Sequence, residues 1–452
     1  MGLSTRTCAA TLGPTASCSW LTVPANRAER GHGTIRLPIA VIPGRTPSAS
    51  TDAVVIPAGG PGYAGLPNSI GASTEALTLD HDVVLLDQRG TGLAEPSLNC
   101  PELEKALVDV LTRADPYATE AQIARNAATA CRARLVAGGV HLEDYNTVSN
   151  AADLVDLRRA LGYERWNILG VSYGSRLALQ LLRVDAAATK AVILDSVYPP
   201  TVGGLANVID ANQRGLDAYG AWCATSASCR SAVPDAKAMI DAIVARYDAA
   251  PATVSVLAPG GGLMTTKLTG ADLIGGLIAG LYDTNTIRGL ALLLPQLAAG
   301  QSGLLSLIVP TAMERLLSIS EGMALSVDCA DNAGSRDAAR DAAVIANPGK
   351  FATIALGAGA SMCDVWDVPP TGPGFNDPVR SDVPVLIMAG SIDPITPPAA
   401  GRAAAATLTR SQYVERAGSG HGLFTDGSCP RGIGLAFLKN PLAPVEGSCL
   451  GA

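Results

Sequence analysis

The stretch Gly170–Gly174, which reads GVSYG, constrains the fold of this chain more than any other. It follows the apolar run Trp166–Leu169 and precedes a segment beginning at Arg176 that is typical of a helix. A G-x-S-x-G motif between a strand and a helix forms a sharp turn, because its small residues let the backbone bend closely. The turn exposes the serine hydroxyl at the end of the strand. Ser172 is therefore a candidate nucleophile, which needs a base and an acid that orients the base.

Apolar runs on both sides of this motif predict a mostly parallel β-sheet. The runs at 53–56, 83–86, 166–169 and 191–194 are short and almost free of polar residues. Helical patterns separate most of them, and strands this apolar are typical of a sheet that helices cover on both faces. We therefore predict an α/β fold.

The alternation of strands and helices stops near residue 201 and returns near residue 381. Between these positions the periodicity predicts helices, including a long one over 302–325. Strand patterns return at Val383–Met388 and at Gln412–Glu415. We predict a core formed by residues 1–200 and 381–452, interrupted by a helical cap or lid over residues 201–380.

The composition excludes several kinds of function. Of the 452 residues, 48% are hydrophobic and 16% are charged, as in a folded globular chain. A net charge of -7 argues against nucleic acid as a partner, and an aromatic content of 4% weakens any base-stacking function. The longest uncharged stretch, 289–313, contains Pro295 and Gln296, which argues against integral membrane association.

The ten cysteines occur as neighbours along the chain. An even number with this spacing predicts up to five disulfides and an oxidising compartment, whereas the alternative is buried free thiols in a cytosolic enzyme. Without a C-x2-C motif or a cysteine–histidine cluster, we expect no metal and no other cofactor. Residues Met1–Ser4 do not resemble a signal peptide, so a secreted or cell-envelope location implies a leader outside this sequence. The expected pairs are Cys8–Cys18, Cys100–Cys131, Cys223–Cys229, Cys329–Cys363 and Cys429–Cys449.

The chain has only four histidines, which makes the search for a base short. His421 lies in a glycine-rich loop after the last predicted strand, at the sheet edge where ligands bind in open α/β sheets. The other three, His32, His81 and His141, are expected away from this edge. His421 is therefore the candidate general base, and a surface loop histidine is the alternative interpretation.

The orienting acid should follow a strand and lie between the serine and the histidine in the sequence. Asp393 meets both conditions. Asp195 also ends a strand and is the rival, although a turn or capping role before Pro199 suits it better. The order Ser172, Asp393, His421 is one of the three known chain orders of a Ser–His–Asp triad.

Backbone N–H groups near the serine are candidates for an oxyanion hole. The strand at 53–56 leads into Ala58-Gly-Gly-Pro-Gly62, where glycines let N–H groups approach a ligand closely, although an ordinary tight turn is the alternative. We expect one donor from Gly60 or its neighbour and the other from Tyr173. Gly59, beside them, is a candidate substrate-binding residue.

Six motifs in a fixed order suggest a family. They are GGPG at 59–62, DQRGTG at 87–92, GVSYGS at 170–175, ILDSVYPP at 193–200, GSIDPITPP at 390–398 and GSGHG at 418–422. Over about residues 50–440 the chain resembles the secreted tripeptidyl aminopeptidases and related prolyl aminopeptidases. The resemblance implies an α/β-hydrolase fold with an inserted helical cap and a TAP-like C-terminal segment. It also implies release of short peptides or a proline-type residue from free N-termini.

The resemblance further implies that carboxylates of the cap hold the substrate α-amino group. The segment 321–331 carries three candidates: Glu321, Asp328 and Asp331. A desolvated carboxylate paired with an ammonium group would register the N-terminus of a peptide. Family position favours Asp331, and solvated acids near a disulfide are the alternative.

Three functions from different classes remain open. The first is an aminopeptidase of the tripeptidyl or prolyl type, and the second is a carboxylesterase that uses the same residues on hydrophobic esters. The departures Ala58 and Ala94, where relatives often have histidine and serine, leave this choice open. The third is a non-catalytic binding protein, which the intact serine, aspartate and histidine disfavour. In each enzymatic case the partner is a small peptide or ester substrate, and we expect a monomer.

Overall fold

A nine-stranded sheet forms the centre of the molecule. The computed structural model describes residues 2–29, 31–46, 53–68, 71–258, 261–357 and 359–451. The sheet order is β1-β2-β3-β5-β4-β6-β7-β10-β11, antiparallel from β1 to β5 and parallel from β5 to β11. The strands are β1 (Gly2–Arg6), β2 (Ser17–Pro24), β3 (Thr34–Ile42), β4 (Ala53–Ile56), β5 (Val83–Leu86), β6 (Trp166–Val171), β7 (Thr189–Asp195), β10 (Val385–Gly390) and β11 (Ser411–Arg416). The carboxyl ends of the six parallel strands, from β5 to β11 in this order, therefore lie at the same edge of the sheet.

Helices cover both faces of this sheet, as the apolar strands predict. The helices are α1 (Gly65–Asn68), α2 (Ala72–Leu77), α3 (Pro101–Leu111), α4 (Tyr117–Ala137), α5 (Thr147–Leu161), α6 (Tyr173–Val184), α7 (Leu205–Thr225), α8 (Ala227–Ala232), α9 (Ala236–Ala249), α10 (Gly270–Gly280), α11 (Thr284–Ala298), α12 (Leu305–Leu317), α13 (Glu321–Asp331), α14 (Ala338–Ala346), α15 (Ala352–Gly357), α16 (Cys363–Trp366), α17 (Pro398–Ala405) and α18 (Ser428–Lys439).

The two faces of the sheet belong to different hydrophobic clusters because side chains alternate along a strand. Ile168 of β6 packs with Leu154 of α5 and Leu177 of α6. Leu169, the next residue along β6, joins the cluster that contains Phe437 of α18. The predicted α/β fold, with a mostly parallel sheet covered on both faces, is confirmed.

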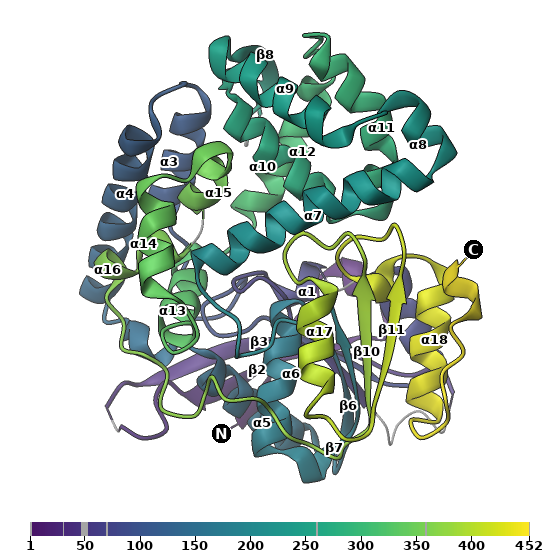
Figure 1. The fold of residues 1–452 in the computed structure, drawn as a ribbon. Coiled ribbons are helices and arrows are strands. Elements are labelled where there is room, and N and C mark those ends of the chain that lie inside the picture. The colour runs from purple at the N-terminus through teal and green to yellow at the C-terminus, as the bar shows by residue number, and fades with distance from the viewer. Residues whose placement is uncertain are drawn as a thin grey trace.

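The chain between β7 and β10 builds a separate hydrophobic cluster above the sheet. Helices α7 to α12 lie together there (Figure 1), and their buried side chains include Tyr219, Ile243 and Leu294. This region also contains a two-stranded antiparallel sheet of β8 (Ala252–Leu257) and β9 (Leu263–Leu268), which the periodicity does not predict. The region forms a mixed cap with its own core, and the limits 201 and 380 remain predictions.

The expectation of one helix over 302–325 is wrong, because two helices, α12 and α13, share this stretch. The break falls at 318–320, where the backbone meets the loop after β4, which contains residues 58–62 and is called the glycine loop below. Ile319 forms a β-bridge with Tyr63, and the N–H of Ser320 donates to the carbonyl of Gly62 at 2.9 Å. A periodic pattern cannot reveal this interruption because its cause is a contact with a distant loop. Helix α13 then packs against the main cluster through Met323 and Val327, not against the cap cluster.

Five disulfides join the cysteines in the expected pairs. They are Cys8–Cys18, Cys100–Cys131, Cys223–Cys229, Cys329–Cys363 and Cys429–Cys449, and no cysteine in the described chain is free. The bond from Cys329 to Cys363 joins α13 to α16. The prediction of five local disulfides is confirmed, and the cysteines are not free thiols.

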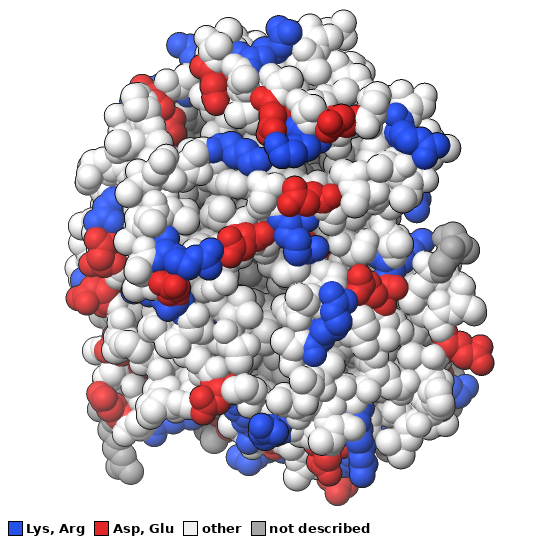
Figure 2. Space-filling view, viewed as in Figure 1, with Lys and Arg blue, Asp and Glu red and all other residues white. Residues whose placement is uncertain are grey.

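Charged side chains of both signs are interspersed on the face shown in Figure 2. This distribution matches the modest net charge of -7 and provides no extended basic surface on that face. Among the described helices, none combines the length and the apolar composition that a membrane span requires.

We expect the disulfides to contribute unequally to stability. The loops that they close differ in length, with sequence separations of 34 for Cys329–Cys363 and 6 for Cys223–Cys229. Loop-closure entropy predicts that replacing the first pair by serine lowers the free energy of unfolding by about 4 kcal/mol, and replacing the second by about 2 kcal/mol. Urea unfolding of the two double variants measures this difference, and equal losses would contradict it.

Candidate active site

Ser172 occupies a sharp turn between β6 and α6. Its backbone has φ 58° and ψ -125°, a conformation that is costly for a residue with a side chain. The turn is tight enough that a Cβ on Gly170 would lie 2.4 Å from the carbonyl oxygen of Gly174. A Cβ on Gly174 would lie equally close, 2.4 Å, to the carbonyl oxygen of Pro57. Both glycines of the motif are therefore required by close backbone approach, and the turn holds the serine at the carboxyl edge of the sheet.

His421 and Asp393 form a direct pair at the same edge. The Nδ1 atom of His421 lies 2.9 Å from Oδ2 of Asp393, whose side chain is fully buried. Thr396 joins them, since its hydroxyl donates to the same carboxylate oxygen at 2.7 Å and lies 3.1 Å from the imidazole Nδ1. The other carboxylate oxygen accepts the N–H groups of Ile395 and Thr396. Asp393 is thus held from both sides and can fix the orientation of the ring.

The segment after β11 that carries His421, residues 417–424, is called the histidine loop below. It lies beside the strand that leads to Ser172. A methyl group added to Gly422 would lie 3.7 Å from Cγ1 of Val171, the last residue of β6. The structure therefore brings His421 and Asp393 to the same edge as Ser172, although they lie far apart in the sequence. Burial alone would raise the pKa of Asp393, but the charge and hydrogen bond of His421 lower it below its usual value. The carboxylate is accordingly ionised and suited to pair with an imidazolium.

The glycine loop after β4 lies against the serine turn. A Cβ added to Gly59 would lie 3.6 Å from Cβ of Ser172. Gly60 has φ 110°, which a residue with a side chain rarely adopts. The side chain of Gln88 supports this loop by donating from Nε2 to the carbonyl of Ala58 at 2.9 Å. The DQRGTG motif thus holds the glycine loop in place, a role that its sequence alone does not reveal.

Tyr173 contributes its backbone to this edge, not its side chain. The ring is buried, and its hydroxyl lies 2.9 Å from Oγ1 of Thr147 in the core. Tyr173 is the first residue of α6, and an N–H at that position has no acceptor within its own helix. Tyr173 and the glycine loop therefore both lie next to Ser172, and they stay candidates for an oxyanion hole.

The cap contacts the histidine loop directly. The N–H of His421 donates to the carbonyl of Tyr282 at 2.9 Å, and the two rings lie 4.8 Å apart at an angle of 54°. Asn212 of α7 donates to the carbonyl of Pro394, and Ile392, the residue before Asp393, packs into the hydrophobic cluster of the cap. The cap is therefore built onto the loops that carry the candidate acid and base.

Two of the three cap carboxylates are occupied by internal hydrogen bonds. Asp331 is fully buried and accepts the N–H of Thr147 on one oxygen and the hydroxyl of Thr371 on the other. Glu321 accepts the N–H of Cys100 at 3.3 Å, and burial raises its pKa to about 7. Both residues tie α13 to the core.

Asp328 differs from these two. It is half-buried, and Nδ2 of Asn332 donates a long hydrogen bond of 3.4 Å to its Oδ1. Asn332 in turn accepts a hydrogen bond from Arg176, which lies one helical turn after Ser172, at 2.8 Å. Burial raises the pKa of Asp328 to about 6, and the charge of Arg176 opposes this effect. Asp328 thus combines a carboxylate with few hydrogen-bond partners and a connection, through Asn332 and Arg176, to α6.

The sequence does not single out Thr396 or Tyr282, and it does not reveal which groups Asp195 contacts. Thr396 follows Asp393 by three residues, a spacing that favours a side-chain turn and could have indicated it. Tyr282 and Asp195 act through contacts with residues far along the chain, and no local pattern signals such contacts.

Two of the other histidines, His32 and His141, contact one another instead of this site. The rings of His32 and His141 stack with centroids 3.8 Å apart at 15°, and His32 contacts Asp144 at 2.8 Å. Stacked parallel rings cannot both direct a lone pair at one ion, although these histidines and Glu143 have ligand atoms within 4.8 Å of one another. The other such group in the described chain contains cysteines that form a disulfide.

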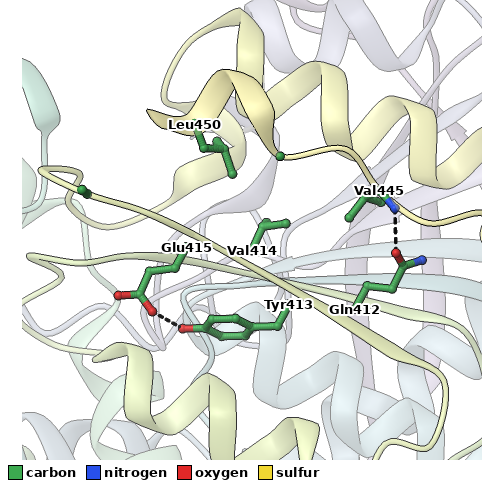
Figure 3. A pocket seen from close by; sticks show the side chains of 8 residues that line it. Gln412, Tyr413, Val414, Glu415, Val445 and Leu450 are labelled. Carbon is green, nitrogen blue, oxygen red and sulfur yellow. Dashed lines mark hydrogen bonds between the residues drawn. The ribbon is translucent and has the colours of Figure 1, made fainter. Parts of the chain in front are cut away.

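A separate hollow of about 610 Å³ lies along the outer strand β11 (Figure 3). Tyr413 and Glu415 of this strand are joined there by a hydrogen bond, and Gln412 holds Val445 of the C-terminal segment. None of its lining residues is a candidate nucleophile, base or oxyanion donor. The chemistry at the carboxyl edge, not this hollow, therefore marks the candidate active site.

Two family models match the chain. Residues 52–217 match the model described as alpha/beta hydrolase fold, and residues 351–449 match the model described as TAP-like protein. The first range contains Ser172 and the glycine loop, and the second contains Asp393 and His421. The two matches thus cover the six parallel strands, β4 to β7, β10 and β11, and leave out β1 to β3 and most of the predicted cap.

Similar proteins include peptidases. Serine protease Hip1 of Mycobacterium tuberculosis is 28% identical over 471 residues, which cover 96% of this chain and 87% of that protein. Tripeptidyl aminopeptidase of Streptomyces lividans is 29% identical over 200 residues, 41% of this chain and 36% of that protein. Among solved structures, esterase RhEst1 from Rhodococcus sp. ECU1013 covers 90% of this chain and 95% of its own with 14% identity and a TM-score of 0.42. A TM-score this low carries no argument about function.

Glu321 should make the stability of the fold depend on pH. Its pKa is raised from 4.5 to about 7 in the folded chain, so the folded state binds more protons than the unfolded state between these values. Stability therefore falls as pH rises through this window. We expect the melting temperature to be lower at pH 7.5 than at pH 5, and Glu321→Gln to reduce that difference. The exposed Glu314→Gln is the control, and an unreduced difference in Glu321→Gln would contradict the prediction.

Proposed function

Because this chain belongs to the α/β-hydrolase family and has a TAP-like C-terminal segment, we propose that it is a serine exopeptidase acting on free N-termini. It would release short peptides or a proline-type residue through an acyl-enzyme. The observation that carries the hydrolytic chemistry is the buried Asp393–His421 pair at the same sheet edge as the strained Ser172. The similarity to a serine protease and to a tripeptidyl aminopeptidase supports the peptidase assignment.

The proposed mechanism uses these residues as a triad. Ser172 Oγ attacks the scissile carbonyl while His421 Nε2 accepts its proton and then returns it to the leaving amine. Asp393 holds the Nδ1–H tautomer and stabilises the imidazolium that forms. Backbone N–H groups of Tyr173 and Gly60 stabilise the tetrahedral oxyanion. Water activated by His421 then releases the acyl group.

Asp328 is the strongest of the three candidates for binding the substrate amine. Asp331, which family position favours, already accepts hydrogen bonds on both oxygens, and Glu321 already holds the N–H of Cys100. The carboxylate of Asp328 instead accepts one long hydrogen bond, of 3.4 Å, from Asn332. An ammonium group there would pair with the charge and lower the raised pKa of this side chain.

The five disulfides favour an oxidising location, so we propose a secreted or cell-envelope enzyme.

The alternative function is a carboxylesterase for hydrophobic esters. The observation that favours it is the uncharged cap stretch 289–313, where Leu292 and Leu307 have 72% and 73% of their surface exposed. Such a surface could receive an apolar acyl chain.

Labelling by a fluorophosphonate tests the nucleophile. Wild-type protein should take up one label per chain, because the reagent reacts with an activated serine hydroxyl. Ser172→Ala should abolish the label and the hydrolytic activity, while circular dichroism confirms that the variant is folded. Ser175→Ala, three residues along α6, is the control for general effects on this turn. A label retained in Ser172→Ala would refute the assignment of the nucleophile.

Peptide anilides with a free or an acetylated N-terminus test the exopeptidase claim. We expect only the free amine to be hydrolysed efficiently, and equal turnover of both would reject an aminopeptidase.

Asp328→Asn should raise KM for the free-amine substrate by about 10–100-fold, since a charge-assisted hydrogen bond contributes about 1.5–3 kcal/mol. Asp367→Asn, an exposed aspartate after α16, should leave KM unchanged. Hydrolysis of p-nitrophenyl esters of increasing acyl length tests the esterase alternative.

A further inference from the structure

Asp195, the last residue of β7, contacts both the serine turn and the histidine loop. Its backbone carbonyl accepts the N–H of Ser172 at 3.0 Å. Its carboxylate is fully buried and accepts the N–H groups of Leu423 at 2.9 Å and Phe424 at 2.6 Å. These are the second and third residues after His421. One residue therefore joins the backbone of the candidate nucleophile to the loop of the candidate base.

Ser196 extends this connection. It is fully buried with φ 53°, a conformation that costs free energy for a residue with a side chain. In that conformation its hydroxyl oxygen accepts the N–H of Gly422 at 2.8 Å, and its own N–H donates to the carbonyl of Met388 in β10 at 2.9 Å. Three consecutive N–H groups after His421 are thus bound by two adjacent side chains.

These contacts connect groups that follow three different strands. Ser172 follows β6, Asp393 follows β10, and His421 belongs to the loop after β11. The strand β7 lies between β6 and β10, so the two residues at its end lie between the groups that must meet. The contacts from β7 are made through backbone N–H groups, which cannot adjust as a flexible side chain does.

We propose that Asp195 and Ser196 are positioning residues, which set the height and orientation of the His421 ring relative to Ser172 by binding the backbone of residues 422–424. Asp195 does not orient the imidazole directly, because both carboxylate oxygens are used by the loop, and Asp393 keeps that role. This inference rests on the proposed function, since it takes Ser172 and His421 as nucleophile and base.

The variant Asp195→Asn tests the proposal with little change in volume. One carboxylate oxygen becomes an NH2 group, which cannot accept the N–H that the oxygen accepted. The loop must then move away, and a misplacement of about 1 Å can cost about 100-fold in rate. We expect kcat for the free-amine anilide to fall about 10–100-fold while KM stays within about twofold. The rate of fluorophosphonate labelling should fall in proportion, with the final label still one per chain.

Ser196→Ala removes one of the three bonds and serves as the second, milder variant. It should lower kcat by about 3–10-fold with KM unchanged, and it decides the question if Asp195→Asn does not fold. Asp82→Asn is the matched control, because Asp82 also binds a backbone N–H, that of Gly44 at 2.8 Å, but before β5, at the amino end of its strand. It should lose stability in urea and keep its kcat.

The outcomes separate this inference from the proposed function. If Ser172→Ala remains active, the proposed function fails and the inference fails with it. If Ser172→Ala is inactive but folded Asp195→Asn and Ser196→Ala keep wild-type kcat, only the positioning role is overturned. A rise in KM with unchanged kcat in these variants would also overturn it, because a displaced base slows chemistry without weakening substrate binding.

Discussion

The turn from β6 into α6 is the constraint on which the rest of the site depends. Ser172 is held at φ 58°, and such strain of about 1–3 kcal/mol persists only where the surroundings leave no alternative. Here the close approach of Gly174 to the carbonyl of Pro57 and the bond from the serine N–H to Asp195 supply that restraint. The strain of one residue is thus offset by contacts with β4 and β7, the two neighbouring strands.

The sheet order explains why distant residues meet at this turn. Strands β7, β10 and β11 lie on one side of β6, so the acid and the base both arrive from that side, while the glycine loop arrives from β4 on the other. The proposed oxyanion donors and the proposed proton-transfer pair therefore approach the serine from opposite sides. The cap segment leaves the sheet after β7 and returns to it at β10. It therefore lies above the loops that carry Asp393 and His421, and Asn212 and Tyr282 of this segment contact them.

The sequence predicts the features that local patterns encode. Apolar strands, the GVSYG turn and the neighbouring cysteines lead to the fold class and the disulfide pairs, because each depends on residues close together in the chain. The break before α13 and the hairpin of β8 and β9 escape prediction for the opposite reason. The break is imposed by the glycine loop, and each strand of the hairpin is too short to outweigh the helical periodicity around it. The contacts of Asp195 are likewise non-local, so the residue resembles an alternative acid until its partners are known.

The position of α13 suggests how a substrate-binding group of the inserted segment could stay fixed relative to the catalytic groups of the sheet. The cap cluster of α7 to α12 is separate from the main core, so its surface can vary without disturbing the sheet. Helix α13 instead packs into the main core, begins at the glycine loop and is joined to α16 by Cys329–Cys363. A substrate-binding carboxylate on this helix, as we propose for Asp328, would keep a fixed distance from Ser172 whatever the rest of the cap does. Selection by distance from a free N-terminus requires that rigidity, because a carboxylate on a mobile lid could not register the scissile bond.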